Sequence, residues 1–184
     1  MPRPHRLSGF TLIELMVTIT ILAILLAIGV PSFGSMIRSG QVASETNTFL
    51  AALNSARSEA SKRGLPVTVC AASDKSLTAC GDGSGWQTNG WLIITDAAGD
   101  PGKLDLAGGD VILEKSKPLA EPMQINTAYG FVRFNPSGVR TNEPGVFEMP
   151  FRLRHNICGK ADDEQRNVQV NRNGRVTMSK GKCT

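Results

Sequence analysis

Residues suited to catalysis are scarce in this chain. Only two of its 184 residues are histidines, and aromatic residues make up 5%. His155 is the histidine outside the amino-terminal segment, and no serine or cysteine lies in a motif that would pair it with a general base. The four cysteines form no Cys-x-x-Cys pair near a histidine, which argues against a zinc site. The sequence thus gives little support to an enzyme, and it predicts no cofactor.

Charge is almost absent between Phe10 and Val30, where Glu14 is the one charged residue. A membrane-spanning helix needs about twenty mainly apolar residues, and this run has that length. A carboxylate inside such a segment costs roughly 2.5 to 3.5 kcal/mol on insertion scales. Glu14 therefore needs a partner or a function. The alternative is a plain signal anchor that tolerates a glutamate.

A short basic leader precedes this run, as the positive-inside rule predicts for the cytoplasmic side. A secretory signal has its cleavage site after the hydrophobic core, whereas here Gly9 and Phe10 form a junction in front of it. The sequence Gly-Phe-Thr-Leu-Ile-Glu of residues 9–14 resembles the amino end of the type IV prepilins. The resemblance implies that a membrane prepilin peptidase cuts after Gly9 and methylates the new amine of Phe10.

The resemblance also implies a role for Glu14 in assembly. The cut leaves an ammonium group at Phe10, and a carboxylate four residues later lies one helical turn away, near the positive end of the helix dipole. In the family, this carboxylate is thought to meet the amine of a neighbouring subunit and to set the axial register. The expected partners are therefore other minor and major pilins or pseudopilins, the prepilin peptidase and the inner membrane.

A long helix is predicted from Phe10 to Arg63, with a kink at Pro31. Its end is indicated by Lys62 and Arg63, by Gly64 and by Pro66. We expect four segments: a leader (1–9), a transmembrane and assembly helix (10–31), an amphipathic half of the helix (32–64) and a β-rich periplasmic head (65–184). The apolar face expected on the amphipathic half comprises Phe33, Met36, Ile37, Ala43, Phe49, Leu50, Leu53, Ala56 and Ala60.

Short β-rich runs separated by turn residues follow the helix. The expected strands are Leu65–Ala72, Trp91–Thr95, Val111–Glu114, Met123–Thr127, Gly130–Asn135, Phe147–Arg154, Asn167–Asn171 and Arg175–Ser179. The stretch from Ala56 to Asp96, with Trp86 and Trp91, resembles the GspH/FimT family of minor pilins and pseudopilins. The resemblance implies an α+β fold in which the long helix packs on a head of two antiparallel sheets. The two tryptophans flank a turn, and we expect them to be packing residues and not a carbohydrate platform.

The cysteines Cys70, Cys80, Cys158 and Cys183 all follow the membrane segment. An even number of cysteines in an exported domain predicts disulfides. Of the three possible pairings, Cys70 with Cys80 and Cys158 with Cys183 closes the shortest loops, and the sequence leaves the connectivity open.

An acidic loop follows the first strands, and it could be a calcium site because hard cations bind clustered carboxylates. Its members are Asp96, Asp100, Asp105 and Asp110. Their spacing fits no EF-hand loop, so we expect a solvated loop and no metal.

The C-terminal segment is basic, with eight basic and three acidic residues between Arg152 and Lys182 and a net charge of +5. Such a stretch can bind DNA phosphates, although a solvated surface is the alternative explanation. An Asn173-Gly174 hairpin turn would present two arginines at an exposed tip, with two lysines nearby. Residues 174–177 match in part a Gly-Arg-x-Arg motif of family members that take up DNA, with Thr177 in place of the second arginine. The candidate DNA contacts are Arg172, Arg175, Lys180 and Lys182.

The function implied by the family resemblance is that of a minor pilin of a type IV pilus. Such a protein is made as an inner-membrane precursor and incorporated at or near the filament tip to support assembly. Three alternatives stay open: a minor pseudopilin of a type II secretion system, a DNA-binding minor pilin for natural transformation, and a signal-anchored periplasmic enzyme.

Overall fold

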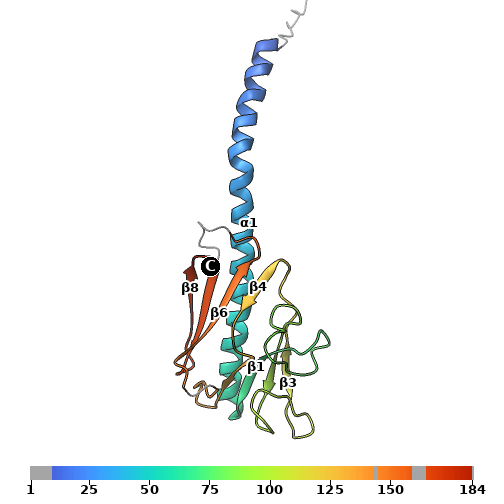
Figure 1. Cartoon of the computed structure of the whole chain (residues 1–184), viewed down its shortest axis with the longest axis vertical. Helices are drawn as coiled ribbons and strands as arrows, with labels where there is room; N and C mark the ends of the chain where they lie inside the picture. Colours follow the sequence, from blue (N-terminus) through green and yellow to red (C-terminus); the bar gives the residue numbers. More distant parts are fainter. Residues whose placement is uncertain (1–9, 143–144, 159–164, 184) are drawn as a thin grey trace, which may run out of the picture. The chain divides into compact units, whose positions relative to one another are not determined.

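The structure, a computed structural model, describes residues 10–142, 145–158 and 165–183, except the side chains of residues 30–32. A helix, α1 (Leu12–Arg63), precedes the strands (Figure 1). The strands in the described part of the chain are β1 (Val67–Ala71), β2 (Trp91–Thr95), β3 (Ile112–Lys115), β4 (Met123–Asn126), β5 (Phe131–Phe134), β6 (Glu148–His155), β7 (Gln165–Asn171) and β8 (Val176–Gly181). The chain divides into two parts, Met1–Arg38 and Ser39–Thr184, and each is described by itself.

In the first part, α1 begins at Leu12 because Thr11 caps it. The backbone N–H of Glu14 donates to the Thr11 hydroxyl at 3.2 Å. The side chains from Phe10 to Gly29 are all exposed, and the helix is long and apolar enough to cross a membrane. The helix continues through Pro31, as predicted, and the kink there stays a prediction.

In the second part, one stripe of α1 is buried against the head. The stripe recurs at alternating intervals of four and three residues, as expected for one helix face, and comprises Val42, Thr46, Phe49, Leu53, Ala56 and Ala60. Thr46 satisfies its hydroxyl by donating to the Val42 carbonyl at 2.6 Å. Phe33, Met36 and Ile37, which begin the predicted apolar face, belong to the first part and are more than half exposed. Their place on this face stays a prediction.

The helix ends where the sequence predicts. Gly64 takes a left-handed φ of 67°, and its N–H bonds the Ala60 carbonyl at 3.0 Å. Lys62 and Arg63 pair with Glu59 at 3.1 and 2.8 Å. Hydrogen bonds from these two cations hold the pKa of the Glu59 carboxyl below its usual value, with Arg63 the larger cause.

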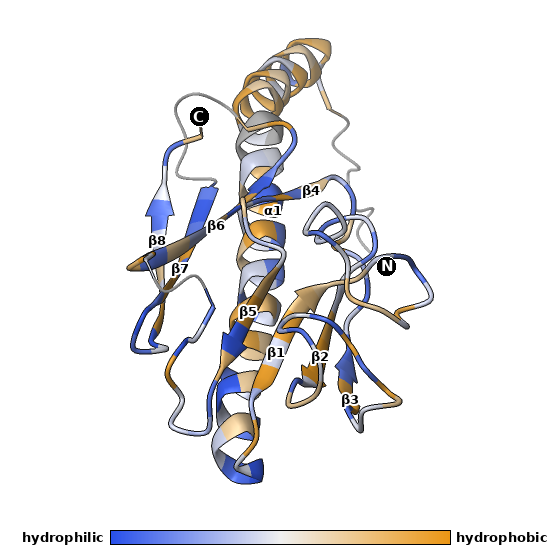
Figure 2. Ribbon diagram, turned by 60° about the horizontal axis from the view of Figure 1, so that its bottom comes forward, coloured by the Kyte–Doolittle hydropathy of each residue, from blue (hydrophilic) through white to orange (hydrophobic). Residues whose placement is uncertain are grey.

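The strands form two antiparallel four-stranded sheets. The first sheet has the order β3-β2-β1-β5, and the second has the order β4-β6-β7-β8 (Figure 2). All eight predicted strands are present, with bounds that differ by at most two residues. The α+β fold with one long helix against two sheets is therefore confirmed.

Four aromatic rings join the helix to both sheets. Phe49 of α1 lies between Trp86, Trp91 of β2 and Phe151 of β6, with ring centroids 5.6, 5.4 and 5.1 Å away. All four side chains are almost completely buried. The Trp86 indole N–H donates to the Tyr129 carbonyl at 2.7 Å, so this ring is also fixed by its polar atom. Both tryptophans are packing residues, as predicted.

The segment after β5 covers that strand's outer edge. The Asn142 side chain donates to the Phe131 carbonyl at 2.8 Å and accepts from the Arg133 N–H at 3.1 Å. The Thr141 N–H donates to the Arg133 carbonyl at 2.9 Å. This arrangement satisfies backbone groups that an open edge would expose.

Candidate assembly site and basic surface

The predicted assembly site lies in the first turn of α1. Glu14 is the third residue of the helix, and its backbone N–H is taken by Thr11, which is the first half of a capping box. Phe10 precedes the cap, four residues from Glu14, and its side chain is 83% exposed. Gly9, the predicted cleavage position, lies outside the described residues.

Every other polar side chain in this apolar stretch is satisfied within the helix or at its cap. Thr18 donates to the Leu15 carbonyl at 2.8 Å, and Thr20 donates to the Met16 carbonyl at 2.7 Å. Glu14 has no side-chain partner among the described residues of this part. Its carboxylate is therefore available for an interaction with a group of another chain.

Two disulfides fix the loops of the head, in the sequential pairing. Cys70 of β1 joins Cys80, which closes the loop after that strand. Cys158, just after β6, joins Cys183, which follows β8. The second disulfide therefore ties the segment after β8 to the end of β6, an inner strand of the same sheet.

The predicted hairpin turn at Asn173-Gly174 joins β7 to β8. The Asn171 N–H donates to the Arg175 carbonyl at 2.9 Å, and Gly174 has a φ of 76°. Arg172 and Arg175 are exposed, as expected.

The turn itself is docked against the head and is not a free tip. Gly174 is buried, and a Cβ there would lie 1.8 Å from the Gly138 carbonyl oxygen. Arg57 of α1 donates to the Asn173 carbonyl at 3.4 Å. Only the outward side chains of this turn are therefore available to a partner.

The four candidate DNA contacts do not form one cluster, which corrects the expected grouping. Lys180 lies opposite Arg166 in the register of β7 and β8, at the end of β8 away from the turn. Arg172 and Arg175 flank the turn itself. Lys180 follows Arg175 by five positions along an extended strand, a distance of roughly 16 Å. Arg166 is buried and so adds no charge to the surface. Arg172 and Arg175 thus lie on one part of the surface, and Lys180 and Lys182 lie on another.

The acidic loop is less solvated than expected, because Asp96 and Asp110 are buried. Asp110 accepts the backbone N–H groups of Ala97, Ala98 and Asp105 at 3.0 to 3.3 Å. Its carboxylate folds the loop, and no cluster of three potential metal ligands occurs in the described chain.

Asp96 holds the loop to the first sheet. It accepts from the Thr68 hydroxyl at 2.5 Å and from the Gly102 N–H at 2.9 Å. Arg133 Nε lies 3.1 Å from the same carboxylate without an aligned hydrogen bond, while its Nη2 donates to the Asp96 carbonyl at 2.7 Å. Burial is the largest effect on this carboxyl and raises its pKa.

His155 is buried at the end of β6. Its Nδ1 accepts the Ile157 N–H at 3.1 Å, so this nitrogen is used in the chain turn. The burial of His155 and this hydrogen bond therefore explain its position by packing and chain geometry.

Sequence reasoning missed two residues that shape these sites. Thr11 caps the assembly helix, and the Thr-x-x-Glu spacing of a capping box was the available signal. Gly138 receives the β7–β8 turn, and no local pattern indicates that contact.

Two family models match the sequence. Residues 5–30 match the prokaryotic N-terminal methylation motif, and residues 45–174 match the family described as type II transport protein GspH. No protein of curated function matches the sequence.

The fold is similar to that of the type IV minor pilin FimU of Pseudomonas aeruginosa. A crystal structure of FimU aligns with a TM-score of 0.50 and 20% identity over 80% of this chain and 92% of FimU. A second crystal form gives a TM-score of 0.47 and 21% identity, covering 75% and 90% of the two chains. Because the GspH match spans most of the chain, the protein belongs to the GspH family of minor pilins and pseudopilins.

Proposed function

We propose that the protein is a minor pilin of a type IV pilus, anchored in the inner membrane by the apolar half of α1 with the head in the periplasm. It is cut after Gly9 and then incorporated at or near the filament tip, where it supports assembly. Its role is structural, in keeping with its family, and it catalyses no reaction.

The observation that carries this proposal is Glu14 at the start of an otherwise uncharged helix. All side chains from Phe10 to Gly29 are exposed, so they need lipid or other helices to cover them. A carboxylate in such surroundings is costly unless a cation meets it. Processing after Gly9 would supply that cation, the amine of Phe10, in this chain or a neighbour.

A second candidate is a minor pseudopilin of a type II secretion system. The matched family carries the description of a type II transport protein, which favours this reading. The similarity to FimU concerns the fold alone and does not decide between the two systems. Both candidates use the same membrane helix and the same processing.

The test is incorporation of a Glu14→Gln variant into sheared surface filaments. The variant keeps the size of the side chain and removes its charge, so it should still be cut but be incorporated at least about tenfold less. Glu45→Gln on the same helix, outside the apolar run, is the matched control and should be incorporated normally. Equal incorporation of both variants would refute the proposed role of Glu14.

A strain that lacks the gene separates the two systems. Loss of surface pili on deletion of the gene, with normal secretion of exoproteins, supports the pilus. Loss of exoprotein secretion with normal pili would show that the protein is a pseudopilin.

A further inference from the structure

A polar groove lies on the outer face of the second sheet. It has a volume of about 350 Å³ and is lined by Pro150, Arg152, Gln165, Asn167, Gln169 and Lys182. The alternate residues of β6 and β7 point inward and form the core: Met149, Phe151, Leu153, Val168 and Val170. The strand pattern therefore turns these polar side chains away from the core.

Amide side chains of β7 form the floor of the groove. Asn167 lies opposite Arg152 of β6, and Gln169 lies opposite Pro150. Gln165 donates through its Nε2 to the Asn167 side-chain oxygen, Oδ1, at 2.7 Å. The chain leaves room for this arrangement at Gly181, because a Cβ there would lie 2.4 Å from Asn167 Nδ2.

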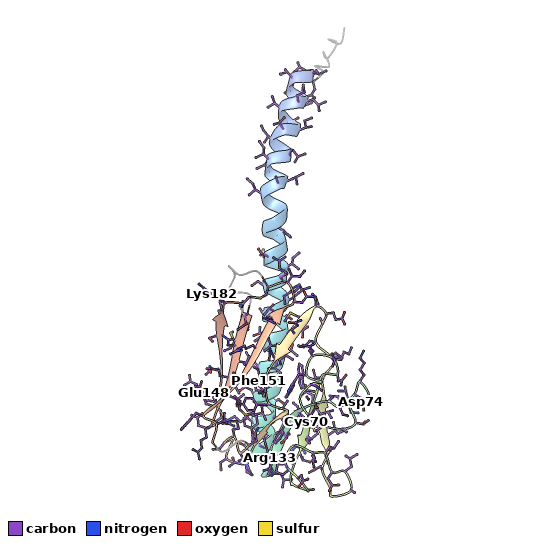
Figure 3. All side chains as sticks on the ribbon, viewed as in Figure 1. Cys70, Asp74, Arg133, Glu148, Phe151 and Lys182 are labelled. Carbon is purple, nitrogen blue, oxygen red and sulfur yellow. A yellow bond between two sulfur atoms is a disulfide. The ribbon has the colours of Figure 1, made fainter. Side chains whose placement is uncertain are left out.

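Cations flank the floor on both sides. Arg152 is on β6, and Lys182 follows β8, so the β7 amides lie between them. Neither cation forms an ion pair with a residue that the structure describes. Glu148 is the one acidic residue on the outward positions of these strands, and it lies at the opposite end of the sheet from Lys182 (Figure 3). The groove therefore suits a ligand with negative charge.

We propose that this groove binds an acidic polysaccharide, a chain of sugars that carry carboxylate groups. Arginine and lysine donate charge-assisted hydrogen bonds to carboxylates. Asparagine and glutamine both donate and accept, as sugar hydroxyls do. A chain lying along β7 would bring its carboxylates to Arg152 and Lys182 and its hydroxyls to the amides.

The amide floor favours a polysaccharide over duplex DNA. Phosphate oxygens of a duplex backbone only accept hydrogen bonds, so they would leave the Gln169 side-chain oxygen, which has no partner among the described residues, without a donor. The Asn167 oxygen already accepts from Gln165. A sugar hydroxyl can donate to the Gln169 oxygen and also accept from the amide N–H groups. DNA affinity also rises with the number of phosphates neutralised, and the groove offers only two cations.

The test is binding of oligogalacturonate by the full mature chain in detergent micelles, measured by calorimetry at low salt. Neutral dextran and duplex DNA are tested in parallel. The natural chain should bind oligogalacturonate, and Arg152→Gln and Lys182→Gln should each weaken that binding by about tenfold. Lys115→Gln, an equal charge change on exposed β3 of the other sheet, is the control and should bind normally.

Gly181→Ala separates recognition from simple charge attraction. Its added methyl displaces Asn167 without altering the net charge, so it should weaken oligogalacturonate binding by severalfold while the melting temperature shows a folded head. Absence of binding by the natural chain would overturn the proposal, as would an equal loss in Lys115→Gln. Binding of DNA in preference to oligogalacturonate, with the same dependence on Arg152, would reassign the groove to nucleic acid.

Discussion

Replacing Phe49 by alanine should destabilise the head more than any surface change. Phe49 is completely buried and contacts rings from both sheets, so it holds α1 to the head. Truncation of a buried phenylalanine costs about 3 to 5 kcal/mol. Its ring contacts with Trp91 and Phe151 add about 0.5 to 1.5 kcal/mol each beyond the buried area, although such terms are not additive. We therefore expect a loss near the upper end of the range.

The loss can be measured as a change in melting temperature. For a domain of roughly 150 residues, 1 kcal/mol corresponds to about 2–4 °C, so Phe49→Ala should melt about 10 °C or more below the natural chain. Near-ultraviolet circular dichroism of the mature chain in detergent follows the surrounding tryptophans. Phe147→Ala is the matched control, because that side chain is 76% exposed, and it should change the melting temperature little. Similar melting of both variants would refute the claim that Phe49 joins helix and sheets.

Four further changes test other parts of the structure. Gly174→Ala should destabilise the head by more than Gly109→Ala in thermal scans, because both glycines have positive φ but only the first would place a Cβ against a neighbouring carbonyl. Cys183→Ser should cost about 2 to 5 kcal/mol of stability, and a variant that melts like the oxidised natural chain would contradict this. Because the pKa of Asp96 is raised, the folded chain binds a proton at this carboxyl more tightly than the unfolded chain does. Proton binding therefore contributes stability that is fully present below the unfolded pKa of about 3.9 and is lost as pH rises through the folded pKa. Thermal scans against pH should therefore favour the natural chain over Asp96→Asn increasingly as pH falls, and a difference independent of pH would argue against it. If the protein also binds duplex DNA at its hairpin turn, Arg175→Gln should weaken that binding and reduce its salt dependence in a filter assay, and unchanged binding would exclude this contact.

The helix and strands were predictable because their signals are local. The helix end required only Gly64 and the preceding basic residues, and the strands followed from short apolar runs between turn residues. The start of the buried stripe was not predictable in the same way. Phe33 and Met36 continue the apolar spacing, but the contacts that bury a helix face come from strands far away in the sequence, and the buried positions of α1 begin at Val42.

The surfaces of the head were predicted less well, because they depend on strand register and on contacts far apart in the sequence. The hairpin turn was recognised from Asn173-Gly174, yet its docking on Gly138 joins segments with no shared local pattern. Lys180 appears close to Arg175 in the sequence, but an extended strand carries it to the other end of the sheet. The groove on the outer face arises from the pairing of β6 with β7, which no single segment encodes.

Mass spectrometry of sheared filaments and membrane fractions tests the central claim most directly. The account predicts that the filament fraction contains a chain that begins at methylated Phe10, and that a Gly9→Val variant stays in the membrane fraction as the uncut precursor. A natural chain that keeps its leader and never enters filaments would contradict the account, as would a mature chain recovered from Gly9→Val.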